Sequence, residues 1–364
     1  MTNQFCISVI VPFYNSELNI KNCINSLLEQ DFEKTFEVIM VDDASTDNSK
    51  NIIKIQNSSL IKLISLSRNS GPAAARNAGL KIAKGEYIFF LDADDTILNN
   101  TLSTLYNHAK ENDFDLVFCD KKRIQNSHNQ RENNYVYPED KVFNNSNILE
   151  EIKKRLFDLN YMQGAVGLHG KLIKNSIIIN NKLCFQNELR YLEDETFIWD
   201  ILGFVNNMKY IHIQLYSYYV NTNLKTARSE GLSRAFPLSY FKIVKNHVQN
   251  CFKKRGLYSK EITKLGDQAL IFFIIYALVS LSLSMITGKV NFEKGFKYRR
   301  KIIDDIIVDP DVLNAIKNYS CSKYESPWIP KSIFLRSRKL IELTCSGRAN
   351  KIIKKNLRRD VRAV

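Results

Sequence analysis

Short apolar runs alternate with amphipathic segments over the first 120 residues of the chain. Five runs have the length and composition of buried strands: Ile7–Val11, Phe36–Val41, Ile61–Leu66, Tyr87–Leu91 and Leu116–Cys119. Between these runs the apolar side chains recur at helical spacing, as in Ile20–Leu28, Ala73–Ala83 and Leu102–Ala109. Strands that are apolar on both faces and alternate with helices predict an α/β fold, with a mainly parallel sheet covered by helices on both sides.

The rest of the chain has a different pattern. Residues 121–147 are polar and rich in asparagine, which is typical of a long surface loop. Two regular-looking segments follow, around Ile148–Leu159 and Ala165–Lys182, and beyond Ala235 the pattern becomes helical. We therefore expect a domain boundary near residue 230, with an α/β domain over residues 1–230 and a helical domain over residues 231–364.

One uncharged stretch allows two interpretations. Ala269–Met285 reads ALIFFIIYALVSLSLSM, which is near the lower limit of the ~17–25 residues that cross a bilayer. The other interpretation is a fully buried helix of the second domain, and the three serines at 280, 282 and 284 favour it.

The net charge of +14 indicates an anionic partner or surface. The first hundred residues are nearly balanced, whereas the segment from Lys331 to Arg362 has many Lys and Arg and few acids. Apolar residues around Ile333 and Leu340 lie among these basic residues, as in a helix that binds an anionic membrane or a partner protein. A solvated basic face is the alternative. The charge therefore concerns docking of the C-terminal part, and no nucleic-acid partner is expected.

Seven cysteines are scattered singly along the chain, without a CxxC pair. This spacing argues against a zinc site and a disulfide framework, and favours a reducing compartment. The first residues lack a basic region followed by a long apolar run, so we expect no signal peptide. The expected location is the cytoplasm, with peripheral contact at the inner face of the cytoplasmic membrane.

Acidic residues follow two of the predicted strands. Asp92 and Asp94 form a D-x-D pair after the fourth strand, and Asp42 and Asp43 follow the second. Parallel strands present their carboxyl ends at one rim of a sheet, where ligands bind, so these acids are expected to lie together. Carboxylate oxygens are ligands that Mg²⁺ or Mn²⁺ prefers, although acids are also common in turns and helix caps.

A Gly71-Pro72 turn opens the helix that carries Arg76. The planar guanidinium of Arg76 suits bidentate contact with a phosphate, while a plain surface arginine is the alternative.

Four segments in this order and spacing resemble family 2 of the inverting glycosyltransferases, which have the GT-A fold. They are PFYN followed by Glu17, VDDASTD, NSGPAAARNAG and GEYIFFLDADD, and the resemblance around them covers roughly residues 5–115. The resemblance continues more loosely to Tyr191–Phe197, which is similar to the ED motif of that family.

The resemblance implies roles for individual residues. It places Pro12, Tyr14 and Glu17 in the nucleotide pocket, Asp43 at the imide hydrogen of a uracil, Arg76 at the base or diphosphate and Asp92 near the ribose. Asp94 would bind the metal, Mn²⁺ or Mg²⁺, and Asp194 of the ED motif would be the general base. His169, Lys171, Tyr191 and Glu193 would border the acceptor side. Tyr191 and Trp199 could stack on a sugar ring there, and the alternative is that these aromatic residues belong to the core.

The implied reaction moves a sugar from a nucleotide-sugar, a UDP-sugar by resemblance, to a hydroxyl of a glycan or lipid-linked acceptor, as in the synthesis of bacterial polysaccharide or lipopolysaccharide. Inversion requires a carboxylate within hydrogen-bond reach of the attacking hydroxyl. A metal ion and Arg76 would stabilise the charge of the leaving diphosphate.

Two other classes of protein remain as alternatives. FFLDADDT also fits the motif of haloacid-dehalogenase-type phosphatases, with Asp92 as nucleophile and Asp94 as acid and base, but that motif normally ends the first strand. A non-catalytic nucleotide-binding module is the second alternative, and the presence of Asp43, Asp92, Asp94 and Asp194 together argues against it.

Overall fold

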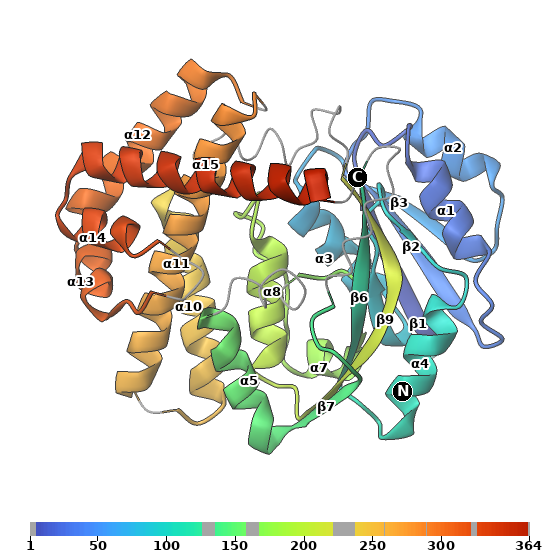
Figure 1. Cartoon of the computed structure of the whole chain (residues 1–364). Helices are drawn as coiled ribbons and strands as arrows, with labels where there is room; N and C mark the ends of the chain where they lie inside the picture. Colours follow the sequence, from blue (N-terminus) through green and yellow to red (C-terminus); the bar gives the residue numbers. More distant parts are fainter. Residues whose placement is uncertain are drawn as a thin grey trace. The chain divides into compact units, whose positions relative to one another are not determined.

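The computed structural model describes residues 5–125, 135–157, 167–220, 237–257, 259–288, 290–321 and 326–362 (Figure 1). The chain divides into two compact units. The first consists of Met1–Glu151 and Asn160–Thr222, and the second of Ile152–Leu159 and Asn223–Val364. The expected boundary at residue 230 lies outside the described residues.

A nine-stranded sheet forms the centre of the first unit, in the order β3-β2-β1-β4-β8-β6-β9-β5, with β7 paired to β9. Pairing is parallel among β1 to β4 and between β6 and β9, whereas β8 runs antiparallel to β4 and β6. The strands are β1 Phe5–Phe13, β2 Phe36–Asp42, β3 Ile61–Ser65, β4 Gly85–Phe90, β5 Thr96–Ile97, β6 Leu116–Gln125, β7 Lys141–Asn144, β8 Lys171–Lys174 and β9 Asn207–Val220. The mainly parallel sheet expected from the apolar runs is confirmed.

Helices cover both faces of the sheet. Leu27 of one helix and Leu105 of another belong to the core cluster on one face, and on the other face a Cβ at Gly79 would lie 2.5 Å from a methyl of Ile10. That close approach explains why glycine stands at position 79. The helices of the first unit are α1 Ile20–Leu28, α2 Ser49–Ile55, α3 Pro72–Ile82, α4 Thr101–Glu111, α7 Asn175–Asn180 and α8 Glu193–Leu202. Helix α5, Asn145–Phe157, begins in the first unit and belongs to the second from Ile152 on.

The polar stretch after residue 120 is not simply a loop, as the sequence had indicated. β6 continues through it to Gln125, and β7 pairs antiparallel with β9. These strands are polar because several of their side chains are half-buried or exposed, so they lack the continuous apolar run of β2, in which every residue is buried. Helix α5 begins at Asn145. The surface-loop prediction was therefore wrong for residues 121–125 and 141–147.

The second unit is helical over its described residues. Its longest helix packs against α10, α12, α13 and α15. Of the described helices, only this one is long and apolar enough to cross a membrane, and 72% of its most apolar window is buried. This burial favours the interpretation as a core helix. The helices are α10 Leu238–Lys254, α11 Ser259–Ile286, α12 Phe292–Val308, α13 Pro310–Asn318, α14 Trp328–Phe334 and α15 Arg338–Arg362.

Candidate active site

Strands β1, β2 and β4 end at one rim of the sheet, and their loops carry the acidic motifs. The Asp43 N–H donates to the carbonyl of Phe13 at 2.9 Å, so the first two strand ends stay together beyond the strands. Three non-glycine residues adopt positive φ near these motifs: Asn15 at 48°, Ala44 at 61° and Leu192 at 66°. Such conformations cost about 1–3 kcal/mol each and cluster at functional sites.

The residues expected in the nucleotide pocket lie on the loop after β1. Pro12 is half-buried, and the Tyr14 side chain is 46% exposed. Glu17 is exposed, and its carboxylate accepts the N–H of Asn48 at 3.0 Å. The contact between Glu17 and Asn48 joins the loop after β1 to the loop after β2. The ring of Tyr14 remains accessible. The contact of these side chains with a nucleotide stays a prediction.

Asp43 is buried and organises the loop before α3. One carboxylate oxygen accepts the N–H of Ser70 at 2.7 Å and the other accepts the N–H of Gly71 at 2.8 Å. Burial raises the pKa of Asp43, and these two N–H donors oppose the increase. Each carboxylate oxygen still has a lone pair that can accept a further hydrogen bond, for example from the imide N–H of a uracil. Recognition of a uracil by Asp43 stays a prediction.

Arg76 connects the D-x-D motif with the ED motif. Its Nη2 donates to Oδ1 of Asp92 and its Nη1 to Oε1 of Glu193, both at 2.8 Å, and the side chain is buried. Burial acts to lower the pKa of Arg76, but the two carboxylates raise it, so the guanidinium stays charged. Both terminal nitrogens are thus engaged by protein carboxylates, and contact of Arg76 with a base or diphosphate stays a prediction.

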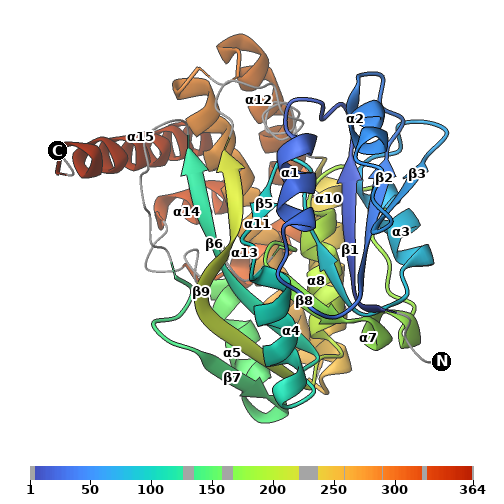
Figure 2. The same ribbon diagram turned by 90° about the vertical axis from the view of Figure 1, so that its right-hand side faces the viewer.

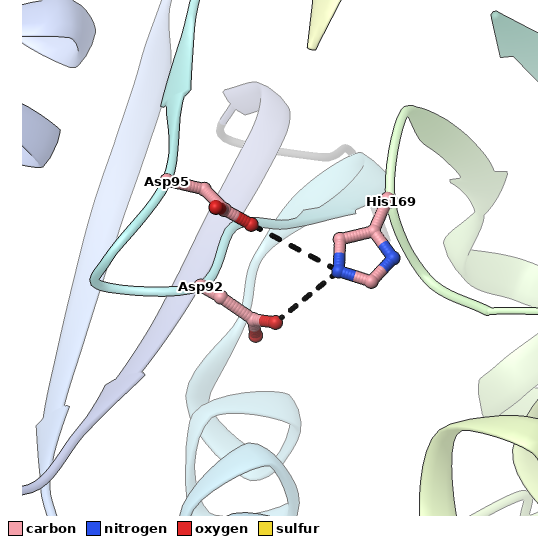
Figure 3. Close-up of side chains that lie close together, drawn as sticks. All are labelled: Asp92, Asp95 and His169. Carbon is pink, nitrogen blue, oxygen red and sulfur yellow. Dashed lines mark ion pairs between the residues drawn. The ribbon is translucent and has the colours of Figure 1, made fainter. Parts of the chain in front are cut away.

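Asp92, Asp95 and His169 gather in front of the end of β4 (Figure 3). Nε2 of His169 lies 3.4 Å from Oδ2 of Asp92 and 3.9 Å from Oδ2 of Asp95. The hydroxyl of Tyr216 donates to Asp95 at 2.7 Å, and the N–H of Tyr219 donates to its other oxygen at 2.9 Å. Asp95 is therefore fully buried and fixed from β9.

The two carboxyl groups of this cluster have very different acidities. Burial acts to raise the pKa of Asp92, but Arg76 and His169 hold it well below its usual range. Burial and the charges of Asp92 and Asp94 raise the pKa of Asp95 to about 8. Burial lowers the pKa of His169 to about 4, so its imidazole is neutral near pH 7. The cluster therefore offers a carboxylate, an acid that loses a proton near neutrality and a neutral imidazole.

These three side chains fit a divalent cation. Nε2 of His169 is buried and makes no hydrogen bond within the described part of the chain. Ligand atoms about 2.1 Å from an octahedral ion lie about 3–4 Å from one another, as the Nε2–Oδ2 distances do here. Asp94, the ligand expected from the sequence, is exposed and lies outside this cluster, so its role as a metal ligand stays a prediction.

Asp194 lies in the first turn of α8, directly after Glu193. It is half-buried, and its Oδ1 accepts the N–H of Glu195 at 2.9 Å. Its Oδ2 is 3.6 Å from the position that a Cβ on Gly167 would take, and Nδ1 of His169 is 3.5 Å from the same point. The candidate base thus lies beside the candidate cation site. Burial and the charge of Asp194 raise the pKa of Glu193 to about 7, against the opposing charge of Arg76.

The other residues expected on the acceptor side have different surroundings. Lys171 is buried in β8 with its ammonium 5.8 Å from the centre of the Phe118 ring, and Tyr191 is half-buried. Trp199 is fully buried and donates to Glu195 at 2.9 Å, so of its two interpretations the structure supports the core residue and not the stacking on a sugar. Most residues of helix α8 are buried, and Trp199 is one of its core residues.

The comparisons with known proteins agree with this geometry. The family model for glycosyl transferase family 2 matches residues 8–168. TarP of Staphylococcus aureus, a poly(ribitol-phosphate) beta-N-acetylglucosaminyltransferase, is 30% identical over 260 residues, which are 70% of this chain and 74% of TarP. The glycosyltransferase GlyG of Streptococcus pneumoniae is 31% identical over 58% of this chain and 70% of its own.

A solved structure shares the fold. The crystal structure of S. aureus TarS in complex with UDP superposes with a TM-score of 0.65 at 21% identity, covering 95% of this chain and 91% of that chain. The architecture is therefore of the GT-A type, followed by a helical C-terminal region. The chain belongs to glycosyltransferase family 2 and is a glycosyltransferase.

Proposed function

We propose that this enzyme transfers a sugar from a UDP-sugar, with inversion, to a hydroxyl of a polyol-phosphate or glycan chain. The bound UDP of TarS supports the choice of donor. The names of two relatives, the TarP enzyme and a poly(ribitol-phosphate) beta-glucosyltransferase of Bacillus spizizenii, support a polyol-phosphate acceptor. The chain covers only 28% of the second of these relatives, so the acceptor is inferred from the part that the two proteins share. A lipid-linked form of the same chain is compatible with this acceptor.

One observation supports this proposal most strongly. Arg76 binds Asp92 and Glu193 at the same time, at 2.8 Å each. This bridge holds the loop after β4 against the first turn of α8, so the candidate base and the candidate cation site share one side of the sheet. A donor bound at the rim would have its anomeric carbon between them, and the acceptor hydroxyl would approach from the side of Asp194.

Asp92, Asp95 and His169 are the residues that would hold a divalent cation. When bound, the cation supplies positive charge to the leaving diphosphate. Between the two ions expected from the sequence, a ligand set with an imidazole nitrogen favours Mn²⁺ over Mg²⁺, which is bound mainly through oxygen. Arg76 orients Asp92 for this role, and Tyr216 orients Asp95.

Asp194 would accept the proton of the attacking hydroxyl at Oδ2, because Oδ1 is occupied by the N–H of Glu195. Its position in the first turn of α8 places the carboxylate at the positive end of the helix dipole. The phosphatase interpretation requires Asp92 as a nucleophile, whereas Asp92 is held by Arg76 beside His169.

A panel of UDP-, GDP- and dTDP-sugars tests the donor and the reaction type. With Mn²⁺ and a ribitol-phosphate oligomer as acceptor, a UDP-sugar is expected to give a glycosylated product of inverted anomeric configuration. A product that retains the donor configuration would contradict the mechanism. Release of phosphate from simple monoesters would favour the phosphatase instead.

We further propose that residues 1–230 form the catalytic domain and that the helical region, residues 231–364, docks on an anionic membrane. Trp328, Phe334 and Leu335 are 64%, 58% and 63% exposed. The exposed residues Lys331 and Arg336 lie next to them in the chain. Exposed apolar side chains beside basic ones are typical of a surface that binds anionic lipids.

A further inference from the structure

The pairing of β6 with β9 changes register at the edge of the candidate site. β6 and β9 run side by side (Figure 2). Cys119 pairs with Ile211, Asp120 with Gln214 and Lys121 with Tyr216, so β9 bulges between these positions. A bulge re-aims the side chains that follow it, and bulges are frequent next to active sites. After the bulge the register is regular to the end of β6.

This bulge places Lys121 on the same face of the sheet as the acidic cluster. Paired residues of neighbouring strands point to the same side, and Lys121 pairs with Tyr216. Tyr216 points to the cluster, because its hydroxyl donates to Asp95 and accepts the N–H of Asp92 at 3.3 Å. The next residue, Lys122, pairs with Ser217 and therefore points to the opposite face.

A short series of rings connects Lys121 with the cluster. The ammonium of Lys121 lies 5.0 Å from the centre of the Tyr218 ring, and the centre of that ring is 5.3 Å from the centre of the His169 ring. An aromatic face attracts an ammonium without cancelling its charge. After burial, the charge of Lys121 is the next cause that lowers the pKa of His169, which agrees with the proximity of the two side chains.

The charges of the site require a further positive group. Asp92, Asp94 and Asp95 follow one another within one loop, and a diphosphate or phosphodiester would be repelled by them. The charge of Arg76 is offset by Asp92 and Glu193, which bind its two terminal nitrogens. A divalent cation held by the carboxylates of Asp92 and Asp95 would have its charge balanced by these two ligands, so a phosphate-bearing substrate would still lack a positive partner. Lys121 is half-buried and lies on the face where that substrate would come.

We propose that Lys121, held over the ring of Tyr218, forms a phosphate-binding subsite beside the candidate cation site. This proposal rests on the proposed function. The phosphate belongs either to the diphosphate of the donor or to a phosphodiester of the acceptor chain. Both present the same anionic oxygens to the ammonium, which binds them as a point charge.

The test compares Lys121→Met with Lys122→Met, which removes an adjacent lysine on the other face. Calorimetric titration with UDP and with uridine, in MnCl₂, measures whether Lys121 contributes to binding of the donor diphosphate. The KM for a ribitol-phosphate oligomer, at a saturating concentration of the UDP-sugar, measures whether Lys121 contributes to binding of the acceptor. We expect Lys121→Met to weaken either UDP binding or oligomer use by about 10- to 100-fold, as for a lost hydrogen bond to a charged group. Uridine binding is expected to be unchanged, and Lys122→Met is expected to match the wild type.

The measurement that changes shows whether the phosphate bound by Lys121 belongs to the donor or to the acceptor. Lys121→Arg, which keeps the charge, should recover most of the lost binding, and Lys121→Gln replaces Lys121→Met if that variant does not fold. Unchanged UDP binding together with an unchanged KM for the oligomer would overturn the proposal. Equal weakening of uridine and UDP would also overturn it, because that result indicates a general distortion of the pocket. A wild-type chain that binds neither UDP nor uridine would contradict the proposed function, and this subsite with it.

Discussion

Nη1 of Arg76 donates to Oε1 of Glu193 at 2.8 Å, although 117 positions separate the two residues in the chain. Both side chains are buried, and Nη2 of the same guanidinium holds Asp92. The residue after Glu193 is the candidate base, and Asp92 belongs to the candidate cation cluster. One arginine therefore sets the distance between the two halves of the site.

Replacement of Arg76 by lysine tests this bridge. An ammonium cannot form the two parallel contacts of a guanidinium, so one carboxylate loses its donor. We expect the free energy of unfolding in urea to fall by about 1.5–3 kcal/mol. We expect kcat to fall by about 100-fold, because the candidate general base, Asp194, is displaced relative to the bound nucleotide-sugar. Arg68→Lys is the matched control, since Arg68 is exposed. Equal kcat values for the two variants would contradict the bridge.

Binding of a cation is expected to depend on pH through Asp95. The pKa of Asp95 is raised to about 8, and a carboxyl group must be ionised to ligate a metal. Below pH 8 the carboxyl group of Asp95 must lose its proton when the cation binds, so the affinity for Mn²⁺ should fall by up to about tenfold for each pH unit towards pH 6. His169, with a pKa of about 4, stays neutral over this range and adds no further change.

Calorimetric titration with MnCl₂ at pH 6, 7 and 8 measures this dependence. Asp95→Asn keeps an oxygen at the same place without a titrating proton, so its affinity is expected to be lower at pH 8 and nearly constant with pH. A wild-type affinity that does not change between pH 6 and pH 8 would exclude Asp95 as a ligand.

Gly167→Ala tests the space between the candidate base and His169. Gly167 has φ of +146°, and its Cβ would lie 3.5 Å from His169 and 3.6 Å from Asp194. We expect the strain to lower stability by about 1–3 kcal/mol. We also expect kcat to fall, because the added methyl group would fill the space between the two side chains in van der Waals contact with both. Gly256→Ala has comparable strain, with φ of +79°, but no atom within 4 Å of its Cβ. Gly256→Ala should lose stability and keep its activity. An equal loss of kcat in the two variants would show that backbone strain alone reduces the activity.

Membrane docking is tested by substitution of exposed residues at the two ends of α14, Trp328 and the C-cap residue Leu335. Truncation is less suitable, because α15 packs against α11. We expect Trp328→Ser with Leu335→Ser to reduce binding to vesicles that contain phosphatidylglycerol by about tenfold or more, as for the loss of two inserted apolar side chains. Ile55→Ser, at a 77% exposed residue of α2, is the control. Cosedimentation measures the bound fraction, and a double variant that binds like the control would contradict docking through α14.

The part of the fold that the sequence predicts best is the part that is buried on both faces. The apolar runs of β1, β2 and β4 coincide with strands, because a central parallel strand leaves no alternation of polar residues. The part of β6 after residue 120 and β7 carry polar side chains, so their composition resembled a loop. Their pairing depends on β9, which is far away in the sequence, and no local pattern reports it.

The site shows the same division. The acids after β2 and β4, Arg76 and Asp194 were identified as candidates because they form motifs within short segments. Asp95 was unassigned and His169 was expected only on the acceptor side, whereas the structure places both beside Asp92. The partner of Asp95 is Tyr216, which is 121 positions away, and the run around Tyr216 shows no local signal for this contact. Contacts that depend on the bulge of β9 could therefore not be predicted.

The most direct test of the central claim is a comparison of Asp194→Asn with the wild type. Transfer from a UDP-sugar to a ribitol-phosphate oligomer and binding of the same UDP-sugar are measured with both proteins in MnCl₂. If Asp194 is the base, Asp194→Asn binds the donor as the wild type does and its kcat falls by about 100-fold or more. An unchanged kcat in Asp194→Asn, at unchanged donor affinity, would contradict the account.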